Sequence, residues 1–557
     1  MLTRLKGLRV VDPVHHAAEQ IRDVYLRNGQ VVAGPNPGER VQRDFDCTGL
    51  IGMAGAIDLH THIGGGNVNI ARALLANEAR RRPEPARAGC AASSLGPMPA
   101  SHATGYRYAA MGYTACFEPA MLPANARQAH AEMGDTPIVD KGAYALLGND
   151  DYLLRLLAGE AAQDEINDYV AWTLAATQAI AIKVVNPGGI SAFKFNGRAL
   201  DVDTAHPHYA VTPRQVLHRL ARAVHELGVP HSLHVHAGNL GVPGNISSTI
   251  ATLEAAEGLP LHLTHAQFHS YGNTGERGFS SAARALAEVV NSRPNLSLDV
   301  GQVMFGQTVT VSGDIMQQHR NARFARPNKW LVMDIENDAG CGVVPFRYRD
   351  RDFVAALQWC IGLELFLLVN DPWRVVLTTD HPNGGPFWSY PRLIRLLMDR
   401  CFRDEQLAAI NPASAAASDL GQLTREYSLA EIAVMTRAAP ARLLGLTDRG
   451  HLGVGAAADV VVYQPDANVE TMFSAPRLVF KDGDVVAERG EVVAQRYGNI
   501  HVVRPEFDAG VRRRVADYFT RYACQRVDSF ELGTTEAQVL GRASRVIVHP
   551  TRGRNAC

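Results

Sequence analysis

The stretch GAIDLHTH, residues 55–62, is a short apolar run that ends in two histidines. Side chains alternate between the two faces of a β-strand, so His60 and His62 point to the same side. Two imidazoles in that arrangement can bind one metal ion. A His-x-His pair also arises by chance in a chain with 21 histidines, so the rest of the sequence has to decide whether this pair is a metal site.

Seven further strand-like runs follow, and amphipathic helical stretches such as PRQVLHRLARAVHEL (213–227) and SAARALAEVVNSR (281–293) lie between several of them. Together with the first run, they span residues 55–62, 112–119, 137–147, 181–189, 231–239, 259–267, 295–303 and 373–382. Strands alternating with helices in this way predict an α/β fold, a (β/α)8 TIM-like barrel. A doubly wound open sheet is the alternative, but it does not normally carry polar residues at so many strand ends.

Polar residues do gather where these runs end. Thr264-His265 ends one run and Thr379-Asp380-His381 ends another. The carboxyl ends of barrel strands meet on one face, where the active site of such a barrel is built. The sequence therefore predicts that these side chains lie near His60 and His62.

Lysine is scarce, because only 6 of the 55 basic residues are lysine. A guanidinium cannot lose its proton to act as a nucleophile, so a chain that uses arginine almost everywhere keeps lysine where a primary amine is needed. Mutational drift explains a few lysines equally well. The position of each lysine in the fold therefore has to decide between the two explanations.

Composition excludes some classes of protein. A net charge of -1 argues against a nucleic-acid-binding surface. The first residues, MLTRLKGLRVVDPVHH, lack the apolar core of a secretory signal, and no run of about 18 apolar residues could span a bilayer. The eight cysteines are scattered without a C-x-x-C pair. We therefore expect no iron-sulfur or structural zinc motif, no membrane partner, reduced thiols and a cytoplasmic location.

A chain of 557 residues is too long for one ordinary core. Strand-like runs joined by a turn at Asn28-Gly29 occur near the start, and GHLGVGAAADVVVYQPD (450–466) and RLVFKDGDVVAERGEVV (477–493) contain more strands. We predict a small β-sandwich domain built from both chain ends, with the following boundaries: residues 1–54 and 446–499 for this domain, 55–445 for the barrel, and 500–557 for an Arg-rich extension without a readable role.

The segment 304–372 lies between the last two barrel strands. It is too long for a simple connector, so we expect it to form a lid or an interface.

Taken together, these residues resemble a family. AIDLHTH after a β-domain, Lys183 at the fourth strand, His236 at the fifth, His265 at the sixth and Asp380 at the eighth are similar to the amidohydrolase superfamily with a binuclear metal site. Longer strings resemble the A subunits of formylmethanofuran dehydrogenases and of bacterial formyltransferase/hydrolase complexes. These strings are KVVNPGG, HVHAGNLGVPGN, LTHAQFHSYG and TTDHPNGGPF.

The resemblance implies hydrolysis of N-formyl-methanofuran, or of its bacterial analogue methylofuran, to formate and the free amine coenzyme. It also implies work within a hetero-oligomeric complex, beside a formyltransferase and other subunits. No molybdenum, tungsten or iron-sulfur ligand pattern stands in the chain, so any redox step is expected to belong to partners.

Residue chemistry agrees with what the resemblance implies. His60, His62 and Asp380 would hold one divalent ion, expected to be zinc, and His236 and His265 a second. Lys183 would bridge the two as N6-carboxylysine, because carboxylation turns a cation into an anionic oxygen ligand. Asp380 would also be the catalytic residue that moves protons.

Several alternatives remain open. His234 shares a strand face with His236, and His269 competes with His265 as a ligand. Lys141 and Lys194 are alternative sites of carboxylation. The candidate substrate-binding residues are Asn186, Asn239, His269 and His381, and His262 is expected to be a core histidine.

Two other functions also remain open. One is a free-standing cyclic-amide hydrolase of the hydantoinase or dihydroorotase type, which would share the metal site without the longer strings. The other is a catalytically silent scaffold subunit, which would have no need of the ligand set.

Overall fold

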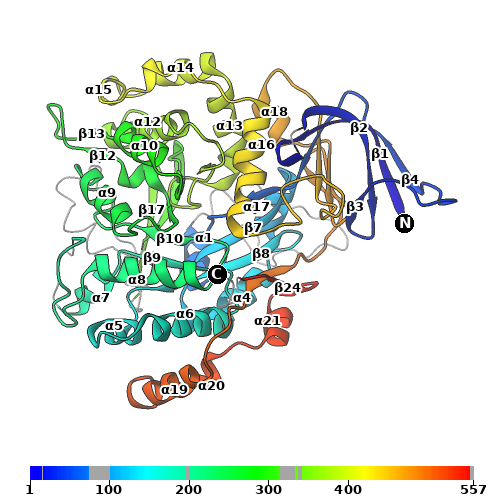
Figure 1. The fold of residues 1–557 in the computed structure, drawn as a ribbon. Coiled ribbons are helices and arrows are strands. Elements are labelled where there is room, and N and C mark those ends of the chain that lie inside the picture. Colours follow the sequence, from blue (N-terminus) through cyan, green and yellow to red (C-terminus); the bar gives the residue numbers. More distant parts are fainter. Residues whose placement is uncertain (16, 75–100, 196–200, 313–332, 336–340, 552–557) are drawn as a thin grey trace.

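Eight parallel strands form the centre of the computed structural model, which describes all residues except 16, 75–100, 196–200, 313–332, 336–340 and 552–557 (Figure 1). Each overlaps one of the eight predicted runs. In chain order they are β6 (Ala56–Asp58), β7 (Tyr113–Met121), β8 (Asp140–Leu147), β9 (Ala181–Val185), β10 (Leu233–His236), β11 (Leu261–Leu263), β14 (Leu296–Asp299) and β18 (Val375–Val376). Each strand pairs with its sequence neighbour in this series from β6 to β18.

The first and last of these strands meet at their carboxyl ends. Thr61 forms a parallel bridge with His381, and the His62 backbone N–H donates to the His381 carbonyl over 2.8 Å. The sheet therefore curls round until the end of β6 lies beside the end of β18. This arrangement confirms the predicted barrel.

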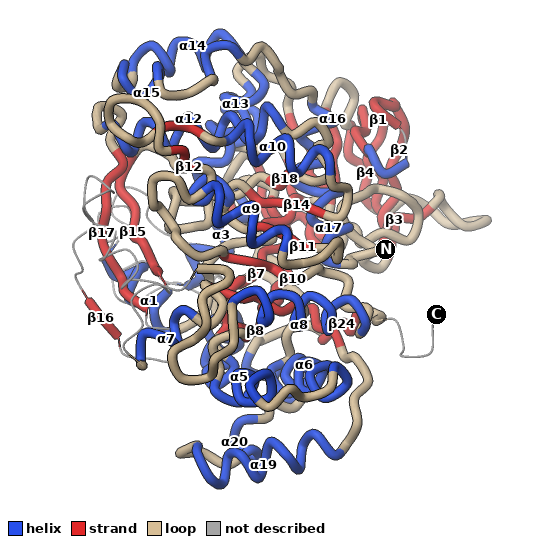
Figure 2. The backbone as a smooth tube through the Cα atoms, turned by 60° about the vertical axis from the view of Figure 1, so that its left-hand side comes forward, coloured by secondary structure: helices blue, strands red, loops and turns tan. Residues whose placement is uncertain are grey.

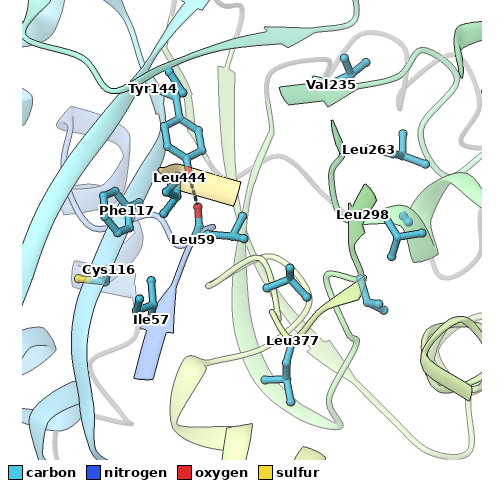
Figure 3. Close-up of a cluster of buried hydrophobic side chains, with 14 of the residues drawn as sticks. Ile57, Leu59, Cys116, Phe117, Tyr144, Val235, Leu263, Leu298, Leu377 and Leu444 are labelled. Carbon is cyan, nitrogen blue, oxygen red and sulfur yellow. Dashed lines mark hydrogen bonds between the residues drawn. The ribbon is translucent and has the colours of Figure 1, made fainter. Parts of the chain in front are cut away.

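Side chains on β10, β11 and β14 alternate between the polar inside of the barrel and an apolar layer on its outer face. His234, His262 and Ser297 pair in register across β10, β11 and β14, and the ring nitrogens of His262 bond to neighbours inside the barrel. The residue that follows each of them faces the other way. These residues are apolar and fully or almost fully buried, and Figure 3 draws them in the core: Val235, Leu263 and Leu298.

Helices alternate with the strands along the chain and surround them (Figure 2). The predicted helix at 213–227 is α8 (Pro213–Glu226), which Thr212 and Gln215 begin with a capping box. The predicted helix at 281–293 is α10 (Ala283–Ser292). The others up to the last barrel strand are α1 (Gly66–Leu74), α3 (Ser101–Ala110), α4 (Ala126–Gly134), α5 (Asp151–Ala158), α6 (Gln163–Thr177), α7 (Gly189–Lys194), α9 (Ile246–Glu254) and α12 (Phe353–Leu368). After it come α13 (Tyr390–Met398), α14 (Arg400–Ala409), α15 (Pro412–Ala416), α16 (Leu429–Ala433) and α17 (Ala439–Leu444).

A second sheet joins the two ends of the chain, as predicted. Its order is β22 (Glu491–Val492), β21 (Asp484–Glu488), β20 (Leu478–Lys481), β19 (Val460–Tyr463), β5 (Ile51–Ala54), β1 (Leu2–Asp12), β2 (Ala17–Arg27) and β3 (Gln30–Val32), with β4 (Arg43–Asp46) also on β1. β5 and β19 form the seam, where Met53 pairs with Val461. The predicted turn at Asn28-Gly29 joins β2 to β3, and both residues have positive φ.

The Arg-rich extension adds to the barrel sheet. β23 (Ile500–Val503) runs parallel to the start of β8, and β24 (Val546–His549) pairs with β23. Three helices lie between them: α19 (Gly510–Tyr522), α20 (Val527–Phe530) and α21 (Thr534–Leu540). This extension is thus built into the same sheet as the barrel. No helix within the described ranges is both long and apolar enough to cross a bilayer.

The segment 304–372 forms an antiparallel sheet and then α12. The sheet consists of β15 (Gly306–Ser312), β16 (Met333–Ile335) and β17 (Cys341–Tyr348). Tyr348 donates its hydroxyl proton to the Asn383 carbonyl over 2.9 Å, and Thr308 donates to the Pro382 carbonyl. The segment therefore contacts the loop that follows Asp380.

A buried charge network connects the second sheet to the barrel. The Lys481 ammonium on β20 lies 3.1 Å from Asp140 on β8 and 2.9 Å from Asp459. Arg449 adds a contact of 2.7 Å to Asp140. Lys481, Asp140 and Asp459 are all at most 4% exposed, so each charge depends on its partners.

Lys481→Met should therefore destabilise the protein strongly. The two carboxylates would lose a buried counter-charge, which typically costs about 3–5 kcal/mol. Thermal and urea unfolding would measure the change. Lys6→Met is the matched control, since Lys6 is an exposed residue of β1; equal destabilisation by the two changes would contradict this role.

Candidate metal centre

His60, His62 and Asp380 come together at the carboxyl ends of β6 and β18. Their candidate ligand atoms lie within 4.8 Å of one another, and all three side chains are buried. The Asp380 Oδ1 atom is 3.0 Å from His60 Nε2 and 3.3 Å from His62 Nε2. Burial alone would raise the pKa of Asp380, but its interactions with His60 and His265 hold it well below its usual range. Asp380 is therefore a carboxylate at neutral pH.

His236, His265 and His269 form a second buried group, again with ligand atoms within 4.8 Å. The His236 and His265 ring centroids are 4.5 Å apart, and His269 lies 5.3 and 5.2 Å from them. Burial holds the pKa values of His265 and His269 well below the usual range for histidine. A neutral imidazole is the form that binds metal.

Buried ring nitrogens of the second group fit metal binding. His265 Nδ1 and both ring nitrogens of His269 have no hydrogen-bond partner among the residues that the structure describes. Leaving a polar atom buried and unpaired costs about 1–3 kcal/mol. A divalent ion would satisfy such atoms, and imidazole and carboxylate, the donors of the two groups, are ligand types that zinc favours.

Lys183 lies on β9, and its neighbour in register on β10 is His234. Its side chain is only 2% exposed. Burial lowers the pKa of Lys183, while Asp380, Asp299 and Glu118 act in the opposite direction. The charge on Lys183 also lowers the pKa of His265. Lys183 therefore interacts electrostatically with a residue of each ligand group, Asp380 and His265.

The alternative lysines lie elsewhere or are not described. Lys141 is fully buried at the start of β8, where its ammonium donates to the Thr136 carbonyl over 2.9 Å. This is the strand end opposite to the candidate site. The side chain of Lys194 lies outside the described residues.

Sequence reasoning missed Glu118, which lies on β7. Its Oε1 atom is 3.0 Å from His62 Nδ1, and the Ile63 and Gly64 backbone N–H groups donate to Oε2 over 2.7 and 3.0 Å. Burial lowers the pKa of His62, but Glu118 and Asp380 outweigh it and raise the pKa to about 9. The signal was a single glutamate near the end of the run GYTACFEP, which contains no histidine.

Asp299, at the end of β14, was also missed. One of its oxygens lies 3.2 Å from both His60 Nδ1 and His262 Nε2. The other accepts hydrogen bonds from the His265 backbone N–H over 3.0 Å and from the Thr378 hydroxyl over 2.8 Å. Asp299 thus links a residue of each ligand group.

His234 and His262 behave differently from His236. His234 Nε2 lies 3.0 Å from His60 Nδ1, and with Asp299 these two residues make a third buried cluster. His262 bonds at both ring nitrogens, to Ser297 and Asp299, as expected for a core histidine. The structure therefore groups His236, and not His234, with His265.

The four candidate substrate-binding residues differ in their contacts. His269 lies in the second ligand group, whereas the His381 ring packs 4.8 Å from Phe387. The Asn239 amide donates to Asp201 over 3.2 Å. Asn186 donates its backbone N–H to the His236 carbonyl. None of these contacts tests a role in substrate binding.

Four of the strand ends turn through the left-handed region of backbone conformation. The residues and their φ values are Asn186 (42°), Asn239 (58°), His265 (35°) and Asp380 (50°). Asparagine, aspartate and histidine adopt this conformation more often than most other residues with a side chain. The turns aim the side chains that follow the strands across the mouth of the barrel.

Comparison with known proteins agrees with this geometry. Residues 44–487 match the amidohydrolase family (Amidohydro_3). The chain is 45% identical to the A subunit of the formyltransferase/hydrolase complex Fhc of Methylorubrum extorquens over 541 residues, which cover 95% of this chain and 96% of that protein. It is 37% identical to protein FwdA of Methanocaldococcus jannaschii, over 94% of this chain and 96% of the relative.

Comparison with solved structures identifies a similar relative. The crystal structure of the FhcABCD complex of Methylorubrum extorquens with methylofuran contains a chain that matches with a TM-score of 0.91 and 43% identity, covering 99% of this chain and 100% of that one. A D-aminoacylase mutant matches with a TM-score of 0.51 and 14% identity over 89% of this chain and 99% of its own, which shows a shared fold. With strand ends, ligand groups and relatives in agreement, the chain belongs to the amidohydrolase family.

Proposed function

We propose that this chain hydrolyses the formyl amide of a methanofuran-type coenzyme, N-formyl-methanofuran or N-formyl-methylofuran, to formate and the free amine. The observation that carries the proposal is the 45% identity, over almost the whole chain, to the A subunit of a formyltransferase/hydrolase complex. The related crystal structure was solved with methylofuran. The two buried ligand groups supply a site suited to amide hydrolysis.

His60, His62 and Asp380 would hold one divalent ion, and His236 and His265 a second, with carboxylated Lys183 as the bridge. We propose zinc, because zinc binds imidazole and carboxylate and keeps a position open in catalytic sites. When bound, the two ions would polarise the amide carbonyl and lower the pKa of a water molecule toward about 7.

Asp380 supplies the proton transfer in this proposal. Its carboxylate is ionised at neutral pH, so it can accept a proton from the attacking water. Water adds to the formyl carbon and forms the new carbon–oxygen bond, and the carbon–nitrogen bond then breaks as Asp380 returns the proton to the leaving amine. The Asn383 amide donates to Asp380 Oδ1 over 3.0 Å and so orients the carboxylate.

The site argues against a silent scaffold. A protein kept only to hold partners would have no use for buried imidazole nitrogens without hydrogen-bond partners among the described residues, since each is destabilising unless a ligand fills the site. A free-standing cyclic-amide hydrolase would share the metal groups. The relatives with high identity, and not the fold, favour a formyl amide as the substrate.

Metal removal provides the direct test. The purified chain with two equivalents of zinc should release formate from the N-formyl coenzyme, and chelation should abolish that release because the ions activate both water and carbonyl. Elemental analysis and a formate assay on the same sample would measure both quantities. Full activity with fewer than about one metal per chain would contradict the two-metal proposal. Hydrolysis of hydantoin or dihydroorotate in place of the formyl amide would favour the free-standing enzyme.

We further propose that the chain assembles with a formyltransferase and other subunits, as the relative in the FhcABCD complex does. Co-expression with candidate partners should give one stable complex on size-exclusion chromatography. The expected complex would let the furan coenzyme pass from the transferase to this site. A fully active, stable monomer without affinity for those partners would contradict the assembly.

A further inference from the structure

Glu118 is a buried carboxylate that accepts hydrogen bonds from the segment around His62 and from the end of its own strand. It is 1% exposed. Its Oε2 atom accepts from the backbone N–H groups of Ile63 and Gly64, and its Oε1 atom from that of Ala120 over 3.0 Å. Since a backbone N–H can only donate, both oxygens of Glu118 must act as acceptors.

His62 Nδ1 is the fourth group on this carboxylate, 3.0 Å from Oε1. Because Oε1 is an acceptor, Nδ1 must carry the proton. When a metal ion replaces the proton on Nε2, an imidazole that keeps its proton on Nδ1 presents its Nε2 lone pair to that ion. That nitrogen is the atom of His62 that lies 3.3 Å from Asp380 Oδ1, on the side of the candidate metal.

We propose that Glu118 is a positioning residue that fixes the tautomer and ring orientation of His62, so that Nε2 is presented to a divalent metal ion. The inference rests on the proposed metal-dependent function. Carboxylates behind metal-binding histidines act in this way in other proteins, and their loss typically lowers metal affinity about 10–100-fold.

Glutamine at position 118 is the informative replacement. Its amide has nearly the same shape, but only one oxygen remains. If that oxygen stays on Ile63 and Gly64, the NH2 group faces the Ala120 backbone N–H and His62 Nδ1. The imidazole must then accept there and carry its proton on Nε2, which removes the lone pair from the metal.

A double-mutant cycle separates positioning from loop support. We expect Glu118→Gln to lower the affinity for one of two zinc ions about 10–100-fold, as measured by competition with a chelator of known affinity. In a His62→Ala background, the same change should have almost no effect on zinc affinity, because no imidazole remains to be oriented. Equal effects in both backgrounds, or no effect in wild type, would overturn the proposal.

Glu132→Gln is the matched control. Glu132 accepts a hydrogen bond from the Gly65 backbone N–H and so supports the same loop, but its side-chain partners are Asn69, Gln128 and Arg72, where Glu118 has His62. It should keep both zinc affinities close to wild type. A loss as large as that of Glu118→Gln would show that loop support alone is responsible.

The test still applies if Glu118→Gln does not fold or if the proposed substrate is wrong. If Glu118→Gln does not fold, the titration is made on Glu118→Asp, whose carboxylate is one methylene farther from His62; wild-type affinity in that variant would overturn the proposal. Wild-type protein that binds two zinc ions but does not release formate refutes the proposed substrate and leaves this test intact. Wild-type protein that binds no zinc refutes both.

Discussion

Lys183→Ala should lose bound metal and turnover together, and a small carboxylic acid such as acetate should restore part of both. Carboxylated Lys183 would provide an anionic oxygen ligand between the two groups, which neutral imidazoles cannot replace. Burial lowers the pKa of this lysine, which increases the fraction of neutral amine that can add to carbon dioxide. Elemental analysis and a formate assay, with and without added acid, would measure the effect.

Lys183→Arg is the control for this prediction. Arginine keeps a positive charge and fills the space that an added acid would occupy, so acid should not rescue it. Normal metal content and turnover in Lys183→Arg would place the bridge on another residue.

Asp380→Asn should bind metal and yet lose a factor of about 100 or more in turnover, because the amide keeps one oxygen ligand and removes the base. Asparagine suits the position, since Asp380 has a φ of 50° and asparagine also tolerates the left-handed region. Turnover would be measured on protein shown to contain two metal ions.

Asp528→Asn offers a matched change of the same chemistry. Asp528 is an exposed residue of α20 that pairs with Arg512, so its substitution should leave turnover close to wild type. A metal-loaded Asp380→Asn protein with wild-type turnover would remove Asp380 from the proton-transfer step.

The barrel could be predicted because polar residues, which are rare inside a buried parallel strand, stand at the ends of the apolar runs. His60, His265 and Asp380 each follow an apolar run, and parallel topology brings such ends to one face. Lysine scarcity was a weaker guide than it first looked. Lys141 and Lys481 are as deeply buried as Lys183. Lys141 donates to a backbone carbonyl, and Lys481 contacts two carboxylates.

Glu118 and Asp299 could not be predicted because their importance comes from contacts, not from spacing. Each is a single acidic residue in its strand, and its partner histidine lies far away in the sequence. The strands of the extension were missed for a different reason. IHVV (500–503) and VIVH (546–549) are four-residue runs, too short to tell apart from loop by periodicity.

The seam between β5 and β19 has a consequence for synthesis of the chain. β5 ends at Ala54, and its partner β19 ends at Tyr463. At about 5–20 residues per second, the ribosome needs roughly 20 to 80 s to make the intervening part. During that time one edge of β5 has no native partner, and an unpaired strand edge promotes aggregation. We therefore expect the growing polypeptide to depend on chaperones more than a barrel without this domain would.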